Sequence, residues 1–395
     1  MNREFIDFVT AHRNDDTARL LLSAHAYPDI DVPLAVQQIE GLRSASLKWP
    51  HLLDHPDFRF PPRLNREQAS SFATATFKAS LLPPGLLVAD LTGGMGIDTL
   101  AFARTAAHVH YVELDPDLCS LMRQNSLSLG FGNISVHCDD CFRWLASHPP
   151  LDALFVDPAR RNASGRKVAA FSDSQPDILA HLDLLLDSCR TLLVKASPMV
   201  DIDLASSQLR CVSDVFVVAV GGECKELLFK CSRSQSTPPL IHCFNLPPDG
   251  SPPQPSLPPF SRSDETSAHA LFASSVGNYL FEPSADLMKG GGYNLIASHW
   301  NILPLGRNSH LYTSDRLIHP FPGRTFRVIQ EIKLNRRCVA SALPDGKAHV
   351  LTRNYPVAAA TLQHQLGLRE GGNLFLIATT LCGSPRGFLC SRDIA

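Results

Sequence analysis

Residues 86–99 are Leu86-Leu-Val-Ala-Asp90-Leu-Thr-Gly-Gly-Met-Gly96-Ile-Asp-Thr99, and this stretch decides the fold. An apolar run ends in an acid, and three glycines and a helix-like segment follow it. The glycines let the backbone turn sharply and approach a ligand without a side chain in the way. This order is typical of the first strand, turn and helix of an α/β domain that binds a nucleotide-like ligand.

The sequence around this stretch alternates between apolar runs and amphipathic segments. We expect strands at 86–90, 108–113, 134–137, 153–157 and 191–195, with helices near 97–104, 117–129, 140–147 and 176–187. Repeated strand–helix units predict a parallel sheet with helices on both faces. Residues 212–220 and 225–231, joined by Gly221-Gly222, predict an antiparallel hairpin at the sheet edge. The predicted fold class is therefore α/β and Rossmann-like, with the parallel sheet closed by a hairpin as in class I methyltransferases.

The remaining sequence suggests four further parts. Residues 1–82 have helical spacing and predict an N-terminal helical region, including one helix from Asn65 to Leu82, before the α/β domain at 83–235. Residues 246–259 hold seven prolines, so we expect 236–264 to be a semi-rigid linker. Residues 265–322 and 323–395 are expected to form two small C-terminal α/β domains.

Composition limits the class of protein. The chain has 395 residues, 44% hydrophobic and 19% charged, as in globular proteins. It has no apolar run long enough to span a membrane and no hydrophobic signal core near its start. Its 11 cysteines are scattered, and the Cys138–Cys141 pair lacks a partner pair at metal-ligand spacing. We therefore expect a cytoplasmic protein without a membrane or metal partner.

Charge is distributed unevenly along the chain. Residues 324–395 hold ten Lys/Arg and four Asp/Glu, whereas residues 1–323 hold 26 and 34. A basic terminal module on an acidic body fits a polyanionic partner that binds at one end. The alternative interpretation is an ordinary solvated surface.

Acids follow three successive predicted strands and define the expected ligand. Asp90 precedes the glycines, Glu113 ends the second strand and Asp140 follows the third. Asp90 suits the ammonium group of S-adenosylmethionine and would repel a pyrophosphate. Glu113 can accept both ribose hydroxyls, which fits NAD equally well. Asp140, preferred to Asp139 for its spacing to Leu145, can accept from the adenine amine. Each acid alone could be a helix cap, but all three together favour S-adenosylmethionine.

The fourth strand ends in Asp157-Pro-Ala-Arg160-Arg161, the expected catalytic group. Asp157 could accept a hydrogen bond or a proton from a substrate nitrogen, Pro158 would fix the turn, and Arg160 could hold a phosphate. Softer candidates for the substrate mouth are 195–199 and 223–226. No cysteine adjoins the motif, as a pyrimidine C5 mechanism would prefer.

Four strings together identify a resemblance: DLTGGMGIDT, YVELDP, FVDPARR and LLVKASPMVDID. The chain resembles the class I methyltransferases that have a C-terminal THUMP-like domain. REQASSFATATFKA, EPSADLMKGG, NSHLYTSD and FPGRTF extend the resemblance to almost the whole chain. It implies a ferredoxin-like piece at 265–322 and a THUMP-like piece at 323–395.

The resemblance also implies which residues bind the cofactor. S-adenosylmethionine would be held by Asp90, Thr92, Gly93, Gly94, Gly96, Glu113 and Asp140, with Gln68 and Ser71 near its methionine end. THUMP domains bind RNA, chiefly tRNA, so the implied activity is methylation of a base nitrogen in tRNA or rRNA. Three alternatives stay open: methylation of a protein or small molecule, a non-catalytic RNA-binding protein with a vestigial pocket, and NAD-dependent oxidoreduction.

Overall fold

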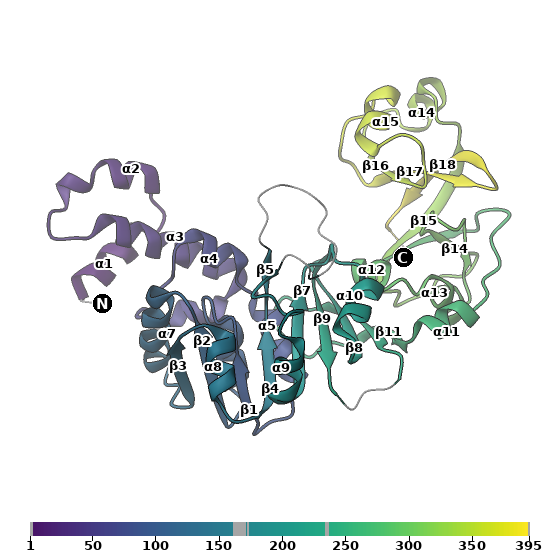
Figure 1. Ribbon diagram of the computed structural model, residues 1–395. Helices are drawn as coiled ribbons and strands as arrows, with labels where there is room; N and C mark the ends of the chain where they lie inside the picture. Colours follow the sequence, from purple (N-terminus) through teal and green to yellow (C-terminus); the bar gives the residue numbers. More distant parts are fainter. Residues whose placement is uncertain (1–2, 161–170, 172–173, 234–236, 394–395) are drawn as a thin grey trace. The chain divides into compact units, whose positions relative to one another are not determined.

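The computed structural model describes residues 3–160, 171, 174–233 and 237–393 (Figure 1). The chain forms two compact units. The first holds residues 1–221, 225–239 and 246–253, and the second holds residues 222–224, 240–245 and 254–395. Among the described residues, no helix has both the length and the apolar character needed to cross a bilayer.

The N-terminal region is helical, as the sequence predicts. Its helices are α1 (Arg3–Ala11), α2 (Thr17–Leu22), α3 (Val32–Lys48), α4 (Arg63–Gln68) and α5 (Phe72–Ser80). The predicted single helix from Asn65 to Leu82 is wrong, because the backbone leaves helical geometry at Ala69. Ser71 then begins α5 as its N-cap, accepting a hydrogen bond from Thr74 N.

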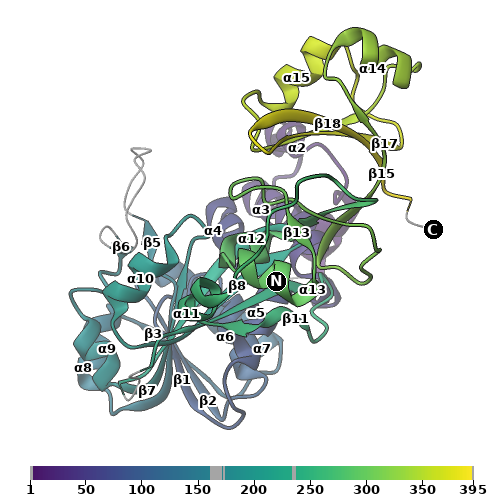
Figure 2. The same cartoon turned by 90° about the vertical axis from the view of Figure 1, so that its right-hand side faces the viewer.

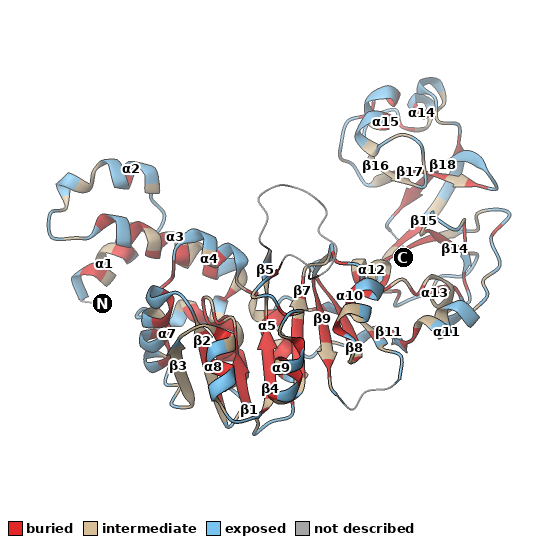
Figure 3. Cartoon of the chain, in the orientation of Figure 1, coloured by how far each residue is buried: buried red, intermediate tan, exposed pale blue. Residues whose placement is uncertain are grey.

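The first unit is built on a mostly parallel sheet, as predicted. Its strands are β1 (Leu87–Asp90), β2 (His108–Glu113), β3 (Ile134–Cys138), β4 (Leu151–Val156), β7 (Cys189–Ala196), β8 (Val212–Val220) and β9 (Glu223–Cys231). They lie in the order β8-β9-β7-β4-β1-β2-β3. β9 runs antiparallel to β7, so the hairpin closes the parallel sheet. The central strands are almost entirely buried (Figure 3).

Helices cover both faces of this sheet. Figure 2 shows α5, α6 (Ile97–Ala103) and α7 (Pro116–Ser128) on one face, and α8 (Cys141–Ser147), α9 (Leu182–Asp187) and α10 (Ile202–Leu209) on the other. Aspartates cap several of them at the ends of strands. A short antiparallel pair, β5 (Ala159–Arg160) and β6 (Ser174–Gln175), follows β4. Because α9 begins at Leu182, the chain from Pro176 to His181 is free to line the carboxyl edge of the sheet.

The second unit contains a seven-stranded sheet in the order β13-β14-β12-β15-β18-β17-β16. Consecutive residues of β17, Leu376 and Ile377, belong to two different hydrophobic clusters, so the sheet is packed on both faces. Its strands are β12 (Tyr279–Pro283), β13 (Leu303–Pro304), β14 (Tyr312–Ser314), β15 (Gly323–Ile332), β16 (His349–Arg353), β17 (Leu374–Leu381) and β18 (Ser384–Ser391). Its helices are α11 (Arg262–Ser267), α12 (Ala285–Gly290), α13 (Tyr293–Trp300), α14 (Arg336–Ala342) and α15 (Ala359–Leu366).

The linker predicted at 236–264 is instead largely structured. β10 (Leu240–Leu246) and β11 (Pro255–Phe260) form an antiparallel pair within it. Proline lacks the donor that an inner strand needs, but it is tolerated in an edge strand. β11 is the last strand of its sheet, so its prolines need no partner on the outer side. The proline count alone therefore does not separate a linker from an edge strand.

Four histidines meet beside Trp144 on one side of β2 and β3. His110 Nδ1 lies 3.1 Å from His137 Nε2, and the rings of His108 and His148 lie 4.9 and 4.7 Å from the His110 ring. Burial, and then the neighbouring imidazoles, lower the pKa of His110 to about 4. Burial also lowers the pKa of His137. His110 and His137 are therefore neutral in the folded protein near pH 7.

Acid should destabilise the first unit through His110. The unfolded histidine takes up its proton near pH 6.5 but the folded one only near pH 4, so stability falls as pH drops between these values. After discounting for solvent access, the loss at pH 5 should be about 1 kcal/mol relative to His110→Gln. Urea denaturation of both proteins at pH 7 and pH 5 measures this difference in the free energy of unfolding. If the free energy of unfolding changed with pH by the same amount in both proteins, the prediction would be wrong.

Candidate functional site

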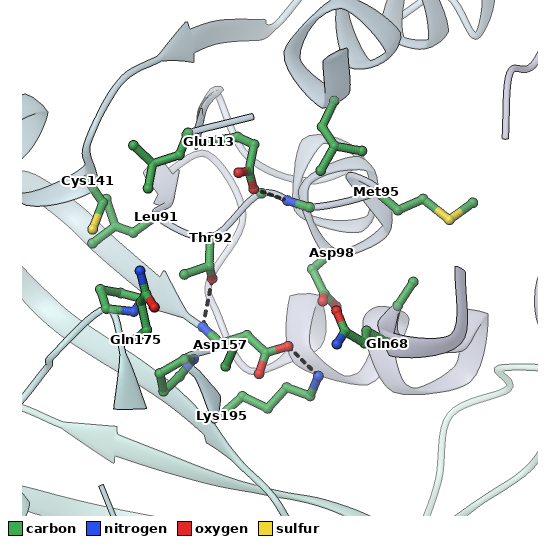
Figure 4. A pocket seen from close by; sticks show the side chains of 18 of the residues that line it. Gln68, Leu91, Thr92, Met95, Asp98, Glu113, Cys141, Asp157, Gln175 and Lys195 are labelled. Carbon is green, nitrogen blue, oxygen red and sulfur yellow. Dashed lines mark hydrogen bonds and ion pairs between the residues drawn. The ribbon is translucent and has the colours of Figure 1, made fainter. Parts of the chain in front are cut away.

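A cavity of about 940 Å³ opens at the carboxyl ends of β1, β2, β3, β4 and β7 (Figure 4). Parallel strands bring the loops that follow them to one edge of the sheet, which is why residues far apart in sequence meet here. Of the predicted site residues, these line it: Gln68, Thr92, Gly93, Gly94, Gly96, Glu113, Asp140, Asp157 and Pro158. The structure therefore brings most of the predicted set together.

The glycine turn is fixed by its own packing. Gly93 lies against the Tyr111 ring, where a Cβ atom would overlap the aromatic carbons. Gly96 has a φ of 84° and begins α6. Tyr111 donates a hydrogen bond from its hydroxyl to Gly94 O at 2.7 Å. The turn is thus held from behind, and its front surface faces the cavity.

Glu113 connects this turn to the end of β2. Its Oε2 accepts a hydrogen bond from Gly94 N at 2.9 Å, and its Oε1 accepts one from Asp115 N at 3.0 Å. Each carboxylate oxygen has a second lone pair, so both can also accept from a ligand. The arrangement is preorganised to receive two neighbouring hydroxyl groups.

Asp140 lies just beyond the end of β3, next to Asp139. Asp140 caps α8 through Oδ1, which accepts from Phe142 N and Arg143 N. Its Oδ2 accepts no hydrogen bond within the part of the chain that the structure describes. Phe142 stacks on His181 with ring centres 3.8 Å apart, and both rings line the cavity. This end of the cavity offers an acceptor beside an aromatic surface, which suits an amine-bearing ring.

Asp90 does not line the cavity, contrary to the prediction. It is 1% exposed, and its two oxygens accept from Thr92 N at 3.2 Å and Thr99 Oγ1 at 2.6 Å. Burial raises the pKa of Asp90 to about 7 despite these hydrogen bonds. Asp90 therefore holds the glycine turn together from inside.

Besides Glu113, Asp98 in the first turn of α6 lines the cavity near this turn. Ser70 donates a hydrogen bond to Asp98 Oδ2 at 2.8 Å, and Gln68 lies beside Asp98 in Figure 4. The predicted Ser71 is excluded from the cavity lining because it caps α5, and its neighbour Ser70 takes the place expected for it. Asp98 was not predicted from the sequence; its position two residues after Gly96, in the first turn of the helix that follows the glycines, could have indicated it.

Asp157 forms an ion pair with Lys195 at the centre of this edge. Lys195 Nζ, from the end of β7, lies 2.5 Å from Asp157 Oδ2. Asp157 N donates to Thr92 Oγ1 at 2.7 Å, which ties the β4 loop to the glycine turn. Asp157 Oδ1 accepts no hydrogen bond from any described residue, and the side chain is 33% exposed. One carboxylate oxygen is therefore held in place while the other remains available to a substrate.

Lys195 was a soft candidate in the sequence, and the structure places it in the cavity lining. Burial alone would lower the pKa of Lys195, but the carboxylates of Asp157, Glu226 and Asp98 raise it above its usual value. Lys195 thus carries its charge throughout the neutral range. Of the other catalytic candidates, Pro158 lines the cavity, whereas the Arg160 side chain lies outside what the structure describes, as does Arg161.

Replacing Asp90 by Asn tests its structural role. The buried acid keeps its proton up to about pH 7 in the folded state but only up to about 3.8 when unfolded, so wild type loses stability as pH rises between these values. Relative to Asp90→Asn, this loss should grow by about 2 kcal/mol between pH 5 and pH 8. Urea denaturation at the two pH values measures it; a constant difference would show that Asp90 is already ionised in the fold.

Comparison with known proteins supports the whole architecture. A family model of a ferredoxin-like domain matches residues 279–322, and one of a THUMP-like domain matches residues 323–392. A solved structure of a proposed methyltransferase from Porphyromonas gingivalis W83 has 29% sequence identity and a TM-score of 0.86. The match covers 99% of this chain and 98% of that one. The α/β fold, the N-terminal helices and the C-terminal domains are thus shared along the full length.

Curated relatives match a shorter part of the chain. The 23S rRNA (uracil(1939)-C(5))-methyltransferase RlmD of Shewanella sp. strain MR-4 is 36% identical over 83 residues, 20% of this chain and 18% of RlmD. A protein-L-isoaspartate O-methyltransferase of Roseiflexus castenholzii is 29% identical over 124 residues, 29% of this chain and 57% of that enzyme. The chain therefore spans about a fifth of the RlmD length. This chain therefore has a ferredoxin-like and a THUMP-like domain at its C-terminal end, and along its full length it is similar to a solved structure described as a proposed methyltransferase.

Proposed function

We propose that the protein transfers a methyl group from S-adenosylmethionine to a nitrogen of an RNA base, in tRNA or rRNA. The observation that carries this proposal is the Asp157–Lys195 pair, which leaves one carboxylate oxygen of Asp157 open in the cavity. RNA methyltransferases and a THUMP-like domain among the similar proteins support the substrate class.

The cavity suits S-adenosylmethionine along its whole length. Glu113 can accept the ribose hydroxyls, Asp140 can accept from the adenine amine, and the Phe142 ring offers a stacking surface. Asp98, Ser70 and Gln68 lie where the methionine end would be held. The cofactor would supply an electrophilic methyl group on a sulfonium. NAD fits less well, because its pyrophosphate would meet Asp98 and Glu113 beside the glycine turn.

Asp157 supports methylation of nitrogen by orienting and then deprotonating the acceptor. Its open Oδ1 can accept a hydrogen bond from an N–H group and take up the proton as the new N–C bond forms. Lys195 holds the other oxygen and can donate to a neighbouring ring nitrogen or carbonyl oxygen of the same base. An edge that presents a donor beside an acceptor is typical of nucleobases. A base within structured RNA would first have to leave its stack.

The cysteine arrangement favours nitrogen over pyrimidine C5 as the acceptor. A C5 mechanism needs a thiolate beside the base. Among the described residues of the cavity lining, the only cysteine is Cys141, at the start of α8 next to Asp140. Burial raises the pKa of Cys141 to about 12, so it stays a thiol. The proposed reaction therefore differs from the one in the name of the RlmD relatives.

A basic surface on the second unit fits an RNA backbone. Arg336, Arg337, Lys347 and Arg369 are exposed around α14. Arg336 Nε donates to Gln365 O at 2.7 Å, and Lys347 and Arg369 are joined by a β-bridge, so these charges gather in one region. Phosphate contacts of this kind give affinity without sequence specificity. We further propose a cytoplasmic location, because buried free thiols such as Cys231 and Cys390 suit a reducing compartment.

Methyl transfer should depend on Asp157 and be directed to RNA. Purified protein incubated with methyl-labelled S-adenosylmethionine should label total RNA and leave a protein extract and a metabolite extract unlabelled. Asp157→Ala should reduce the rate by about 10²- to 10⁴-fold, the usual contribution of a positioned base. Its affinity for S-adenosylhomocysteine should stay within about threefold of wild type, because the cofactor contacts lie elsewhere.

The outcomes of this labelling experiment separate the alternatives. Label in protein or metabolites would move the substrate to those classes, and cofactor binding without any transfer would favour a non-catalytic RNA-binding protein. Nucleoside mass spectrometry of the labelled RNA distinguishes N-methylated bases from C5-methylated uracil. Calorimetry with NAD tests the oxidoreductase alternative directly.

RNA affinity should depend on the basic surface and on salt. The triple variant Arg336→Ala/Arg337→Ala/Arg369→Ala should bind total tRNA at least tenfold more weakly at 0.1 M salt, with a shallower salt dependence. Cofactor affinity should not change. Filter binding over a salt series measures both quantities, with Arg3→Ala/Arg19→Ala/Arg63→Ala, three exposed arginines of the N-terminal helices, as a charge-matched control. Equal RNA affinity of wild type and triple variant would exclude this surface.

A further inference from the structure

Asp157 and Lys195 place two opposite charges side by side at the reaction centre. Lys195 Nζ lies 2.5 Å from Asp157 Oδ2, and both residues line the cavity (Figure 4). The hydrogen bond from Asp157 N to Thr92 Oγ1 fixes this loop against the glycine turn. Within the part of the chain that the structure describes, no group donates to Asp157 Oδ1. A substrate at this point therefore meets one open acceptor beside one charged donor.

Asp157 is the direct partner of the Lys195 charge. Burial lowers the pKa of Lys195, but the carboxylates of Asp157, Glu226 and Asp98 raise it above its usual value, so the ammonium keeps its proton. Glu226 and Asp98 are themselves paired with the buried Lys78. A reaction step that neutralises Asp157 therefore removes the anion closest to Lys195.

Proton uptake by Asp157 transfers its negative charge to the substrate. Lys195 keeps an anionic partner only if the substrate holds this charge on an atom that the ammonium can reach. A lactam, in which an N–H group is bonded directly to a carbonyl carbon, meets this condition, because its conjugate base shares the charge with the carbonyl oxygen. A hydrogen bond between two charged groups is among the stronger ones. Proton transfer from a lactam would therefore exchange one ion pair for another.

The same two groups disfavour the other nitrogens of nucleobases. The exocyclic amines of adenine, cytosine and guanine adjoin a ring nitrogen that accepts hydrogen bonds. Donation from Lys195 to that ring nitrogen would draw the lone pair of the amine into the ring and weaken it as a nucleophile. A ring nitrogen without a proton, such as N7 of guanine, would direct its lone pair at the open oxygen of Asp157, and an ionised carboxylate can only accept.

We infer that the nitrogen methylated at this site is a lactam N–H of an RNA base, as in guanine N1 or uracil N3, and not an exocyclic amine. The inference rests on the proposed function. Asp157 Oδ1 takes the lactam proton, and Lys195 Nζ donates to the adjoining carbonyl oxygen. The N–C bond forms as the C–S bond of S-adenosylmethionine breaks, and the electron pair of that bond stays on sulfur. The proton then passes from Asp157 to solvent.

The identity of the methylated nucleoside tests the inference. Total RNA from a strain that lacks the gene is incubated with the full wild-type chain and methyl-labelled S-adenosylmethionine, and then digested for nucleoside mass spectrometry. The label should appear in 1-methylguanosine or in 3-methyluridine, which separates guanine from uracil as the target. Label in an amine-methylated nucleoside, in 1-methyladenosine or in 7-methylguanosine would overturn the inference and leave the proposed function standing. RNA without label, or with label only on carbon, would mean that the proposed function fails as well.

The pH dependence of Asp157→Ala provides a second measurement. Without its base the variant depends on hydroxide to ionise the acceptor, and the ionised fraction of a lactam rises about tenfold per pH unit below its own pKa. The rate of Asp157→Ala divided by that of wild type should therefore rise steeply from pH 7 to pH 9. An exocyclic amine does not ionise in this range, so a constant ratio would contradict the inference.

Lys195→Gln tests the stabilisation of the anion. The variant keeps a donor but loses the charge, so methyl transfer should slow by about 10²- to 10³-fold, the usual cost of losing one group that stabilises developing charge. Lys195→Arg should retain more activity than Lys195→Gln. Lys230→Gln is the control, because Lys230 lies on the neighbouring strand β9, opposite Leu193, and outside the cavity lining. Its rate should equal that of wild type.

The reverse outcome for Lys195 is equally clear. If Lys195→Gln transfers methyl groups as fast as Lys230→Gln, or faster, the charge does not assist the reaction and the inference is wrong. Thermal denaturation shows whether each variant is folded. Should Lys195→Gln not fold, the nucleoside produced by wild type and the pH dependence of Asp157→Ala decide.

Discussion

The Lys78 ammonium, with no exposure to solvent, is the constraint on which the first unit depends. Removing an unpaired ammonium from water costs several kcal/mol, so the fold must supply charged partners around it. They come from three separate places: Ser70 before α5, Asp98 in α6 and Glu226 in β9. Forming these contacts fixes the N-terminal helices and the hairpin against the glycine turn. The buried ammonium of Lys78 therefore positions Ser70 and Asp98, two residues that line the cavity.

At the carboxyl edge of the sheet, neighbouring acids must also be separated, paired or neutralised. Parallel strands bring Asp90, Asp98 and Asp157 close together, and like charges at short range repel. The fold resolves this differently for each acid. Asp157 is paired with Lys195, Asp98 shares Lys78, and Asp90 is buried with a raised pKa. The three acids thus differ in pairing and exposure because their surroundings differ.

The second unit is held together by a different arrangement of charges. Glu282 on β12 is nearly buried and pairs with Arg324 on β15 and with Arg353 on β16. β12 belongs to the ferredoxin-like part, whereas β15 and β16 belong to the THUMP-like part. Direct pairing of β12 with β15 continues the sheet across that boundary. The two parts therefore share one sheet, although the sequence suggests two separate small domains.

The sequence by itself determined the features that depend on local pattern. Alternation of apolar runs and amphipathic segments predicted β2 and β8 to the residue and β1, β3, β4, β7 and β9 to within two residues, whereas the short β5 and β6 were not predicted. The positions of Glu113, Asp140 and Asp157 at or just after strand ends predicted that they line the cavity, because parallel strands bring their carboxyl ends to the same edge of the sheet. Strand and helix periods are local properties, so a single sequence is sufficient to detect them.

Only the tertiary structure decided which polar groups face the cavity. The sequence pattern favoured Asp90, but the hydroxyl of Thr99 holds this acid inside the turn, and Asp98 lines the cavity instead. Ser70 replaced Ser71 because α4 ends before α5 begins. Lys78 and Glu226 are 148 positions apart, and no local pattern indicates that they meet. Edge position also decided that the proline-rich segment holds a strand. Each of these outcomes depends on desolvation and pairing between distant residues, which are properties of the assembled fold.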